Sequence, residues 1–177
     1  NAGKSTLINK IIGEQISITN KKINTTEELV IGIYCHKIYQ LIFYDTPGLN
    51  FIKNINRKNI KLKRNLWEGL NQSDLIIYLI DSKKFNFKEL EVHLSKLYEL
   101  NQKIILIFNK NDLIEKTKLL PIIKKIDDNY KIESFFSISA KYNLGIKNII
   151  DYLKKNSYTS DWLYHKNTVS NKDDIFM

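Results

Sequence analysis

The sequence predicts an α/β fold in which a mixed, mostly parallel sheet carries helices on both faces. Three continuous apolar runs of strand length alternate with three stretches whose apolar residues recur at helical spacing. Such alternation is typical of parallel sheets, because each parallel connection needs a crossover. A Gly-Lys-Ser-Thr tetrapeptide stands at residues 3–6, and a helical pattern follows it directly. This arrangement is that of a phosphate-binding loop that leads into a helix.

The first part of the chain predicts one helix and one hairpin. Apolar residues recur at helical spacing from Leu7 to Ile12, and Gly13 ends the run. After a polar stretch, two β-rich runs at 29–36 and 39–44 are joined by a connection short enough for an antiparallel hairpin. A turn sequence, Asp-Thr-Pro-Gly, then closes the second run.

The remainder of the chain predicts the parallel sheet and its helices. Residues 53–70 are basic and become helical toward their end, and from residue 156 onward the periodicity fades. We therefore expect a domain over residues 1–155 and a linker or tail over 156–177. The expected strands are 75–80, 104–108 and 135–139, and the expected helices are 88–100, 119–127 and 146–155.

Composition excludes several classes of protein. The chain has 177 residues, 43% of them hydrophobic, which excludes disorder and collagen. The single cysteine, Cys35, cannot form an internal disulfide, and the three histidines lack metal-site spacing, so we expect a cytoplasmic protein without zinc. The longest apolar runs are far too short to span a membrane. The net charge of +9 has two open explanations, a polyanionic partner such as RNA or an acidic membrane surface, and genomic base composition.

The candidate phosphate site combines residues from two places. Gly3 lets the backbone approach a phosphate, Lys4 can bridge the β and γ oxygens, and Ser5 can hold a magnesium ion. Asp45 follows an apolar strand and can hold the same ion through water, while Gly48 leaves a backbone N–H free for a γ-phosphate. Taken singly, the first motif is also compatible with a surface loop and the second with an ordinary turn.

The candidate base site follows the next two strands. In the sequence Asn109-Lys110-Asn111-Asp112, the carboxylate of Asp112 can accept from both the N1–H and the 2-amino group of guanine, a pair that adenine lacks. Lys110 can lie along the base, and Asn109 can connect this loop to the phosphate loop. The segment Ser139-Ala140-Lys141 ends a further strand, where a backbone N–H can meet the guanine carbonyl.

Taken together, these four motifs resemble the Ras-like, translation-factor-class GTPases, and residues 8–18 and 22–26 resemble the Era-type family within that class. The resemblance implies a Ras-like P-loop GTPase domain that binds GTP or GDP with Mg²⁺. Residues implied to contact nucleotide are Asn1, Ala2, Gly3, Lys4, Ser5, Thr6, Asp45, Thr46, Pro47, Gly48, Asn109, Lys110, Asp112, Ser139, Ala140 and Lys141.

The resemblance also assigns roles in hydrolysis. Ser5, Thr26 and Asp45 are implied as the magnesium residues, with Thr26 rather than Thr25 as the switch threonine. Lys4, Thr26 and Gly48 are implied as the catalytic set. Asn1 matches an asparagine associated with potassium. Leu49 stands where Ras-like proteins keep a water-orienting glutamine, which implies slow hydrolysis.

Further implications concern the length of the chain and its departures from the family. The incomplete phosphate motif and the absence of a Gly-X-X-Gly loop after residue 156 predict a G domain without its first strand and without the RNA-binding KH domain. Glu27 and Glu28 replace residues that are usually basic or histidine, and Asn24 replaces a glutamine, which leaves the structure of the first switch and its potassium loop open.

The implied function is a slow GTP-hydrolysing switch in small ribosomal subunit assembly. Its partner would be small-subunit ribosomal RNA or a pre-ribosomal particle, contacted through the KH domain by a monomer in the cytoplasm, with a peripheral contact to the inner membrane as a further expectation. Two alternatives stay open: the G domain of a tRNA-modification GTPase, and a non-catalytic nucleotide-binding or docking module. The basic run in 53–64 is either an RNA contact or a solvated helix face.

Overall fold

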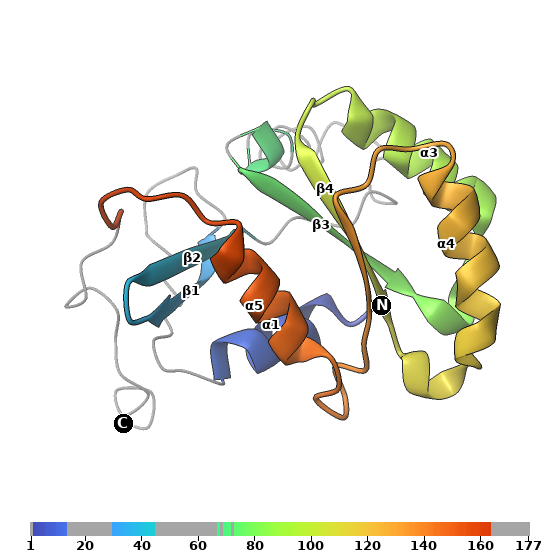
Figure 1. The fold of residues 1–177 in the computed structure, drawn as a ribbon, viewed down its shortest axis with the longest axis horizontal. Helices are drawn as coiled ribbons and strands as arrows, with labels where there is room; N and C mark the ends of the chain where they lie inside the picture. Colours follow the sequence, from blue (N-terminus) through green and yellow to red (C-terminus); the bar gives the residue numbers. More distant parts are fainter. Residues whose placement is uncertain (1, 14–29, 45–66, 68, 72, 164–177) are drawn as a thin grey trace, which may run out of the picture.

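The computed structural model describes residues 2–13, 30–44, 67, 69–71 and 73–163. Its main elements follow one another as α1 (Lys4–Gly13), β1 (Val30–His36), β2 (Tyr39–Tyr44), β3 (Leu75–Asp81), α3 (Phe87–Tyr98), β4 (Lys103–Asn109), α4 (Leu119–Asp127), β5 (Ser134–Ser137) and α5 (Ile146–Lys155) (Figure 1). Single turns of 3-10 helix occupy Ser82–Lys84, Asn111–Leu113 and Lys116–Lys118. The predicted α/β fold class is confirmed.

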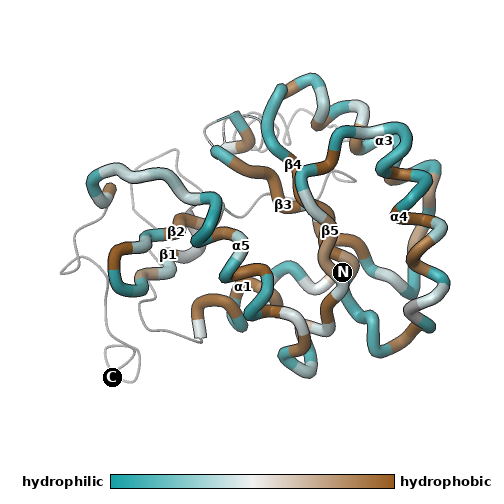
Figure 2. The backbone as a smooth tube through the Cα atoms, in the orientation of Figure 1, coloured by the Kyte–Doolittle hydropathy of each residue, from teal (hydrophilic) through white to brown (hydrophobic). Residues whose placement is uncertain are grey.

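A parallel sheet in the order β3-β4-β5 forms the centre of the fold. In the central strand β4, residues 104–109 are all buried, because helices cover both faces of the sheet. Figure 2 shows hydrophobic residues along β3, β4 and β5, whereas hydrophobic and hydrophilic residues alternate along the surrounding helices. Such a continuous apolar run is the expected sequence of a strand covered on both faces.

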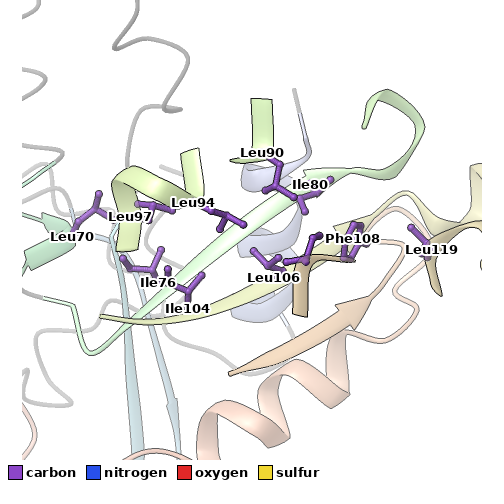
Figure 3. Packing of buried hydrophobic residues seen from close by; sticks show 11 residues of the cluster. Leu70, Ile76, Ile80, Leu90, Leu94, Leu97, Ile104, Leu106, Phe108 and Leu119 are labelled. Atoms are coloured by element: carbon purple, nitrogen blue, oxygen red, sulfur yellow. The ribbon is translucent and has the colours of Figure 1, made fainter. Parts of the chain in front are cut away.

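One face of the sheet is covered by α3 and α4. Leu90, Leu94 and Leu97 lie four and three residues apart on α3, so they share one side of the helix and pack on the strands (Figure 3). Leu94 and Leu97 are at most 1% exposed. The strand residues in this cluster alternate along each strand and are Ile76, Ile80, Ile104, Leu106 and Phe108.

The opposite face is covered by α1 and α5. Leu7 and Ile11 of α1 pack in the same cluster as Ile146 and Ile150 of α5, together with the β4 residues that alternate with the first set. Figure 1 shows the two helices side by side on this face. Helices therefore lie on both faces of the sheet, as predicted.

The predicted hairpin is confirmed, since β1 and β2 pair antiparallel from His36–Tyr39 at the turn to Val30–Tyr44. Its buried Tyr34 joins the core cluster of α1 and α5. Gly32 lets β1 pack closely on α1, because an added Cβ would overlap the present position of the Ile12 side chain. The described strands form two separate sheets, whereas the sequence predicted one mixed sheet; among the described residues no strand joins β2 to β3.

After α5, the described residues 156–163 form no helix. The indole Nε1 of Trp162 donates to the Ile38 carbonyl oxygen at the hairpin turn, 3.2 Å away. The Tyr158 hydroxyl lies 3.5 Å from Asp74 Oδ2. The described part of the tail is thus held against the body of the domain at two places.

Two further expectations depend on segments only partly described. Most of the basic run 53–70 lies outside the described residues, although Trp67 and 69–71 are helical. Among the helices that the structure describes, none is long and apolar enough to cross a membrane.

Candidate guanine-nucleotide site

The candidate site residues gather at the carboxyl ends of the parallel strands. The register places Asp81 of β3 opposite Asn109 of β4, and Phe108 opposite Ser137 of β5. Helix α1 begins at Lys4, and the preceding Ala2 contacts this same edge. Ligand sites of open α/β sheets lie at the carboxyl ends of the strands.

Asn109 joins three loops through one side chain. Its Nδ2 donates to the Ala2 carbonyl oxygen at 2.8 Å, and its Oδ1 accepts from the Ala140 backbone N–H at 2.9 Å. The side chain is buried, as is Ala140. The predicted connection of Asn109 to the phosphate loop is therefore confirmed, and the bond to Ala140 adds the third loop.

Gly3 is required by this contact. Its φ of +94° lies in the region that side chains disfavour, and an added Cβ would stand 2.5 Å from Asn109 Nδ2. The Gly3 carbonyl accepts from the Leu7 N–H at 2.9 Å, which starts α1. The glycine therefore serves both the close approach of the loop to Asn109 and the entry into the helix.

Lys110 is held by a carboxylate that lies outside the predicted motifs. Its backbone is left-handed, with φ of 64°, and its Nζ lies 2.6 Å from Asp81 Oδ2. Burial acts to raise the pKa of Asp81, but the hydrogen bond from Lys110, two backbone hydrogen bonds and the Lys110 charge outweigh it and hold the pKa below 3.8. Asp81 therefore fixes the direction of the lysine side chain beside the base loop.

We expect Asp81→Asn to lower the free energy of unfolding by about 1 kcal/mol at neutral pH. A depressed folded pKa stabilises the fold above the unfolded value of 3.8, and this contribution is lost as the pH falls through the folded value. The difference between wild type and variant should therefore shrink below pH 3.8. Urea unfolding across this range measures it.

A suitable control is Glu115→Gln. Glu115 pairs with Lys118 at 3.3 Å, but both side chains are about 70% exposed (72% and 70%), so its loss should change stability little. An equal effect of the two substitutions would contradict the role of Asp81.

The Asp112 carboxylate is presented by a short turn of helix. Residues Asn111–Leu113 form this turn, and the Leu113 N–H donates to the Lys110 carbonyl at 3.0 Å. The Asn111 N–H donates to the Ile138 carbonyl, also at 3.0 Å, which ties the turn to the end of β5. Asp112 itself is exposed. Its carboxylate is thus accessible to a ligand while its backbone is anchored.

The loop of Ser139, Ala140 and Lys141 is closed by a pair of hydrogen bonds. The N–H groups of Ser139 and Leu144 each donate to the other's carbonyl oxygen, at 3.1 and 3.0 Å. The Ala140 N–H donates to Asn109, and the Ser139 N–H donates to Leu144. Of the three backbone N–H groups in this loop, only that of Lys141 has no acceptor among the described residues. If this loop donates a hydrogen bond to the guanine carbonyl, the Lys141 N–H is the backbone group that is available for it.

The remaining predicted residues are placed only in part. Lys4 lies partly buried at the start of α1, and Ser5 and Thr6 are exposed in its first turn. Asn1, Thr25 and Thr26, with Asp45, Thr46, Pro47 and Gly48, lie outside the described residues. In the part of the chain that is described, no three His, Cys, Asp or Glu side chains gather as a metal site.

A family comparison matches this arrangement. The sequence model of the family described as "50S ribosome-binding GTPase" matches residues 1–110, from the phosphate loop to the start of the base loop. The chain belongs to this GTPase family.

Two relatives illustrate the similarity of this GTPase family member to Era proteins. The chain is 34% identical over 170 residues to GTPase Era of Rhizobium meliloti, covering 96% of this chain and 54% of that protein. It is 32% identical to GTPase Era of Ehrlichia ruminantium, with 96% and 57% covered. The Era-type resemblance inferred from the sequence is therefore confirmed for this G domain. The chain spans about half the length of the curated relatives it matches.

Solved structures agree on the fold of this GTPase. Era in complex with MgGDPNP and nucleotides 1506–1542 of 16S ribosomal RNA matches with a TM-score of 0.75 at 25% identity, over 96% of this chain and 57% of that one. A single-residue variant of Aquifex aeolicus Era bound to GDP.AlF4- matches with a TM-score of 0.74 at 24% identity, over 97% and 58%. The Ras-like P-loop GTPase fold is therefore established.

Proposed function

We propose that this domain binds guanine nucleotides with Mg²⁺ and hydrolyses GTP slowly as a molecular switch. The Asn109 side chain carries the proposal, because its two hydrogen bonds hold the phosphate loop, the base loop and the Ala140 loop at one strand edge. That bracing sets the distance between the groups for the phosphates and those for the base. The names of the Era relatives and the nucleotide complexes of the Era structures support the same function.

The chain's own residues divide into binding and hydrolytic roles. Backbone N–H groups at the start of α1 and the Lys4 ammonium would bind the β- and γ-phosphates, where the helix dipole also favours an anion. Bound Mg²⁺ would neutralise charge on the phosphates. Ser5, Thr26 and Asp45 would hold the ion, and Gly48 would donate its N–H to the γ-phosphate. Asn1 is proposed to bind potassium.

Competition binding tests the nucleotide assignment. In the full-length protein with magnesium, fluorescent GDP should be displaced by GDP, whereas ADP should fail because it lacks the paired donors that Asp112 accepts. Displacement by both nucleotides would contradict a guanine site. Binding without any phosphate release from GTP would favour the non-catalytic module.

The proposed cellular role is small ribosomal subunit assembly. The family description names the 50S subunit, but the relatives are Era proteins, and one Era structure contains nucleotides 1506–1542 of 16S ribosomal RNA. We assign residues 1–155 to the G domain and 156–177 to a linker toward an RNA-binding KH domain. Binding of that RNA fragment by the full-length protein tests the role, and loss of tRNA modification rather than ribosome assembly on gene deletion would contradict it.

The proposal also includes the state and location of the protein. We assign a monomer in the cytoplasm that contacts the inner membrane peripherally. Sedimentation of the full-length protein measures the first, and fractionation of cells measures the second. A dimer in solution would contradict the first assignment. Protein that stays in the membrane fraction at high salt would contradict a peripheral contact, since salt weakens electrostatic binding to a surface.

A further inference from the structure

A basic cluster lies where the β1–β2 hairpin meets the end of α5. Lys37 stands at the hairpin turn in a left-handed conformation, with φ of 54°. Lys154 lies in the last turn of α5, and its Nζ is 5.3 Å from the centre of the Tyr34 ring on β1. His36 directly precedes Lys37, and its ring centre lies 6.4 Å from that of Tyr34. Two elements far apart in the chain thus bring their cationic groups together.

The charges of this cluster are not neutralised within the described residues. Neither Lys37 nor Lys154 forms an ion pair there. Burial, Lys154 and Lys37, in that order, lower the pKa of His36, which places both lysines near this imidazole. Its Nδ1 is buried without a hydrogen-bond partner in the described structure. Two cations without an ion-pair partner among the described residues are a suitable environment for an anion with several oxygens.

Helix capping does not account for the cluster. A lysine in the last turn of a helix favours the negative end of the helix dipole, and this explains Lys154 in part. It does not explain Lys37, which is on the hairpin. The Lys154 side chain is also directed over Tyr34, which is 2% exposed, so its ammonium is held toward the hairpin.

We propose that Lys37 and Lys154 bind the phosphodiester backbone of RNA, at a site separate from the nucleotide site. The ten residues of α5 carry the chain about 15 Å away from the Ala140 loop, so both sites can be occupied together. Two lysines are fewer than the four to eight basic residues typical of anionic-lipid recognition, which favours discrete phosphate contacts over a membrane surface. This inference rests on the RNA partner of the proposed function.

Salt-dependent RNA binding by the full-length protein tests the site. The probe is a labelled RNA of nucleotides 1506–1542 of 16S ribosomal RNA, the fragment in the Era complex. We expect Lys37→Glu with Lys154→Glu to reduce the slope of log affinity against log salt by about 1.8 for duplex or about 1.4 for single-stranded contacts. For duplex contacts, the ratio of wild-type to variant RNA affinity should therefore fall about twelvefold between 50 and 200 mM salt.

A charge-matched control separates the site from general electrostatics. Lys88 and Lys124 are exposed on α3 and α4, which cover the other face of the sheet, so their double glutamate variant changes net charge equally and should keep the wild-type slope. Lys37→Arg with Lys154→Arg should restore binding. All variants should keep wild-type affinity for GDP, which shows that they fold.

Four outcomes would overturn the proposal. Slopes that are reduced equally in the two glutamate variants would assign the effect to net charge, and slopes that stay at the wild-type value in both would remove the site. Loss of binding to vesicles containing phosphatidylglycerol, with RNA binding kept, would assign the cluster to membranes. Absence of RNA binding by the wild-type protein, with GDP binding intact, would remove the RNA partner and this inference while leaving the nucleotide site.

Discussion

Substitution of Asp112 by asparagine should reduce GDP affinity at least about 100-fold and shift the preference toward xanthosine diphosphate. Guanine presents two adjacent donors, and a carboxylate can accept from both. In an asparagine, the amide NH₂ replaces one carboxylate oxygen, so a donor faces a donor of guanine and neither is satisfied. Xanthine has a carbonyl at the same position and can accept from the amide. Competition of both nucleotides against fluorescent GDP or XDP measures the shift.

The control for this substitution is Asp128→Asn. Asp128 is an exposed carboxylate at the end of α4, remote from the strand edge of the site, so its loss should leave nucleotide preference unchanged. Unchanged guanine preference in Asp112→Asn would refute the base assignment. Equal weakening of both nucleotides would assign Asp112 to loop structure instead.

Periodicity was sufficient for most of the fold. The helices at 119–127 and 146–155 have the predicted bounds, because each combines a strong apolar stripe with a defined end. The third parallel strand ends at Ser137 rather than at the predicted residue 139. Ser139 instead pairs with Leu144, and this return of the chain requires the left-handed Asn143 and Gly145. A local turn therefore ended a strand whose apolar pattern continued.

The site was less completely predicted, because its connections are made by tertiary structure. Asn109 is the last residue of the buried strand β4, so its contact with the phosphate loop could be anticipated. Asp81 also ends a strand, but its partner Lys110 is 29 residues away and becomes a neighbour only through the β3–β4 register. The hydrogen bond from the Ala140 N–H to Asn109 likewise depends on how two loops pack.

Loss of the Asn109 side chain should affect both stability and nucleotide binding. Asn109→Ala removes the acceptor of the Ala140 N–H and the donor to the Ala2 carbonyl oxygen. Ala140 is only 1% exposed, so its N–H would be left buried without a partner. An unsatisfied buried donor costs about 1–3 kcal/mol, so we expect the free energy of unfolding to fall by about 2 kcal/mol. Urea unfolding without nucleotide measures this effect.

The same substitution should lower the affinity for GDP about 30-fold. Without Asn109, binding must itself order the loops, at a cost of about 2 kcal/mol. Asn111→Ala is the matched control, since it lies in the same loop and loses a 3.3 Å hydrogen bond to the exposed Ser137 hydroxyl. Its stability and GDP affinity should stay near those of the wild type. Equal effects of the two alanines, or a stable Asn109→Ala with normal GDP affinity, would show that the loops hold their geometry without Asn109.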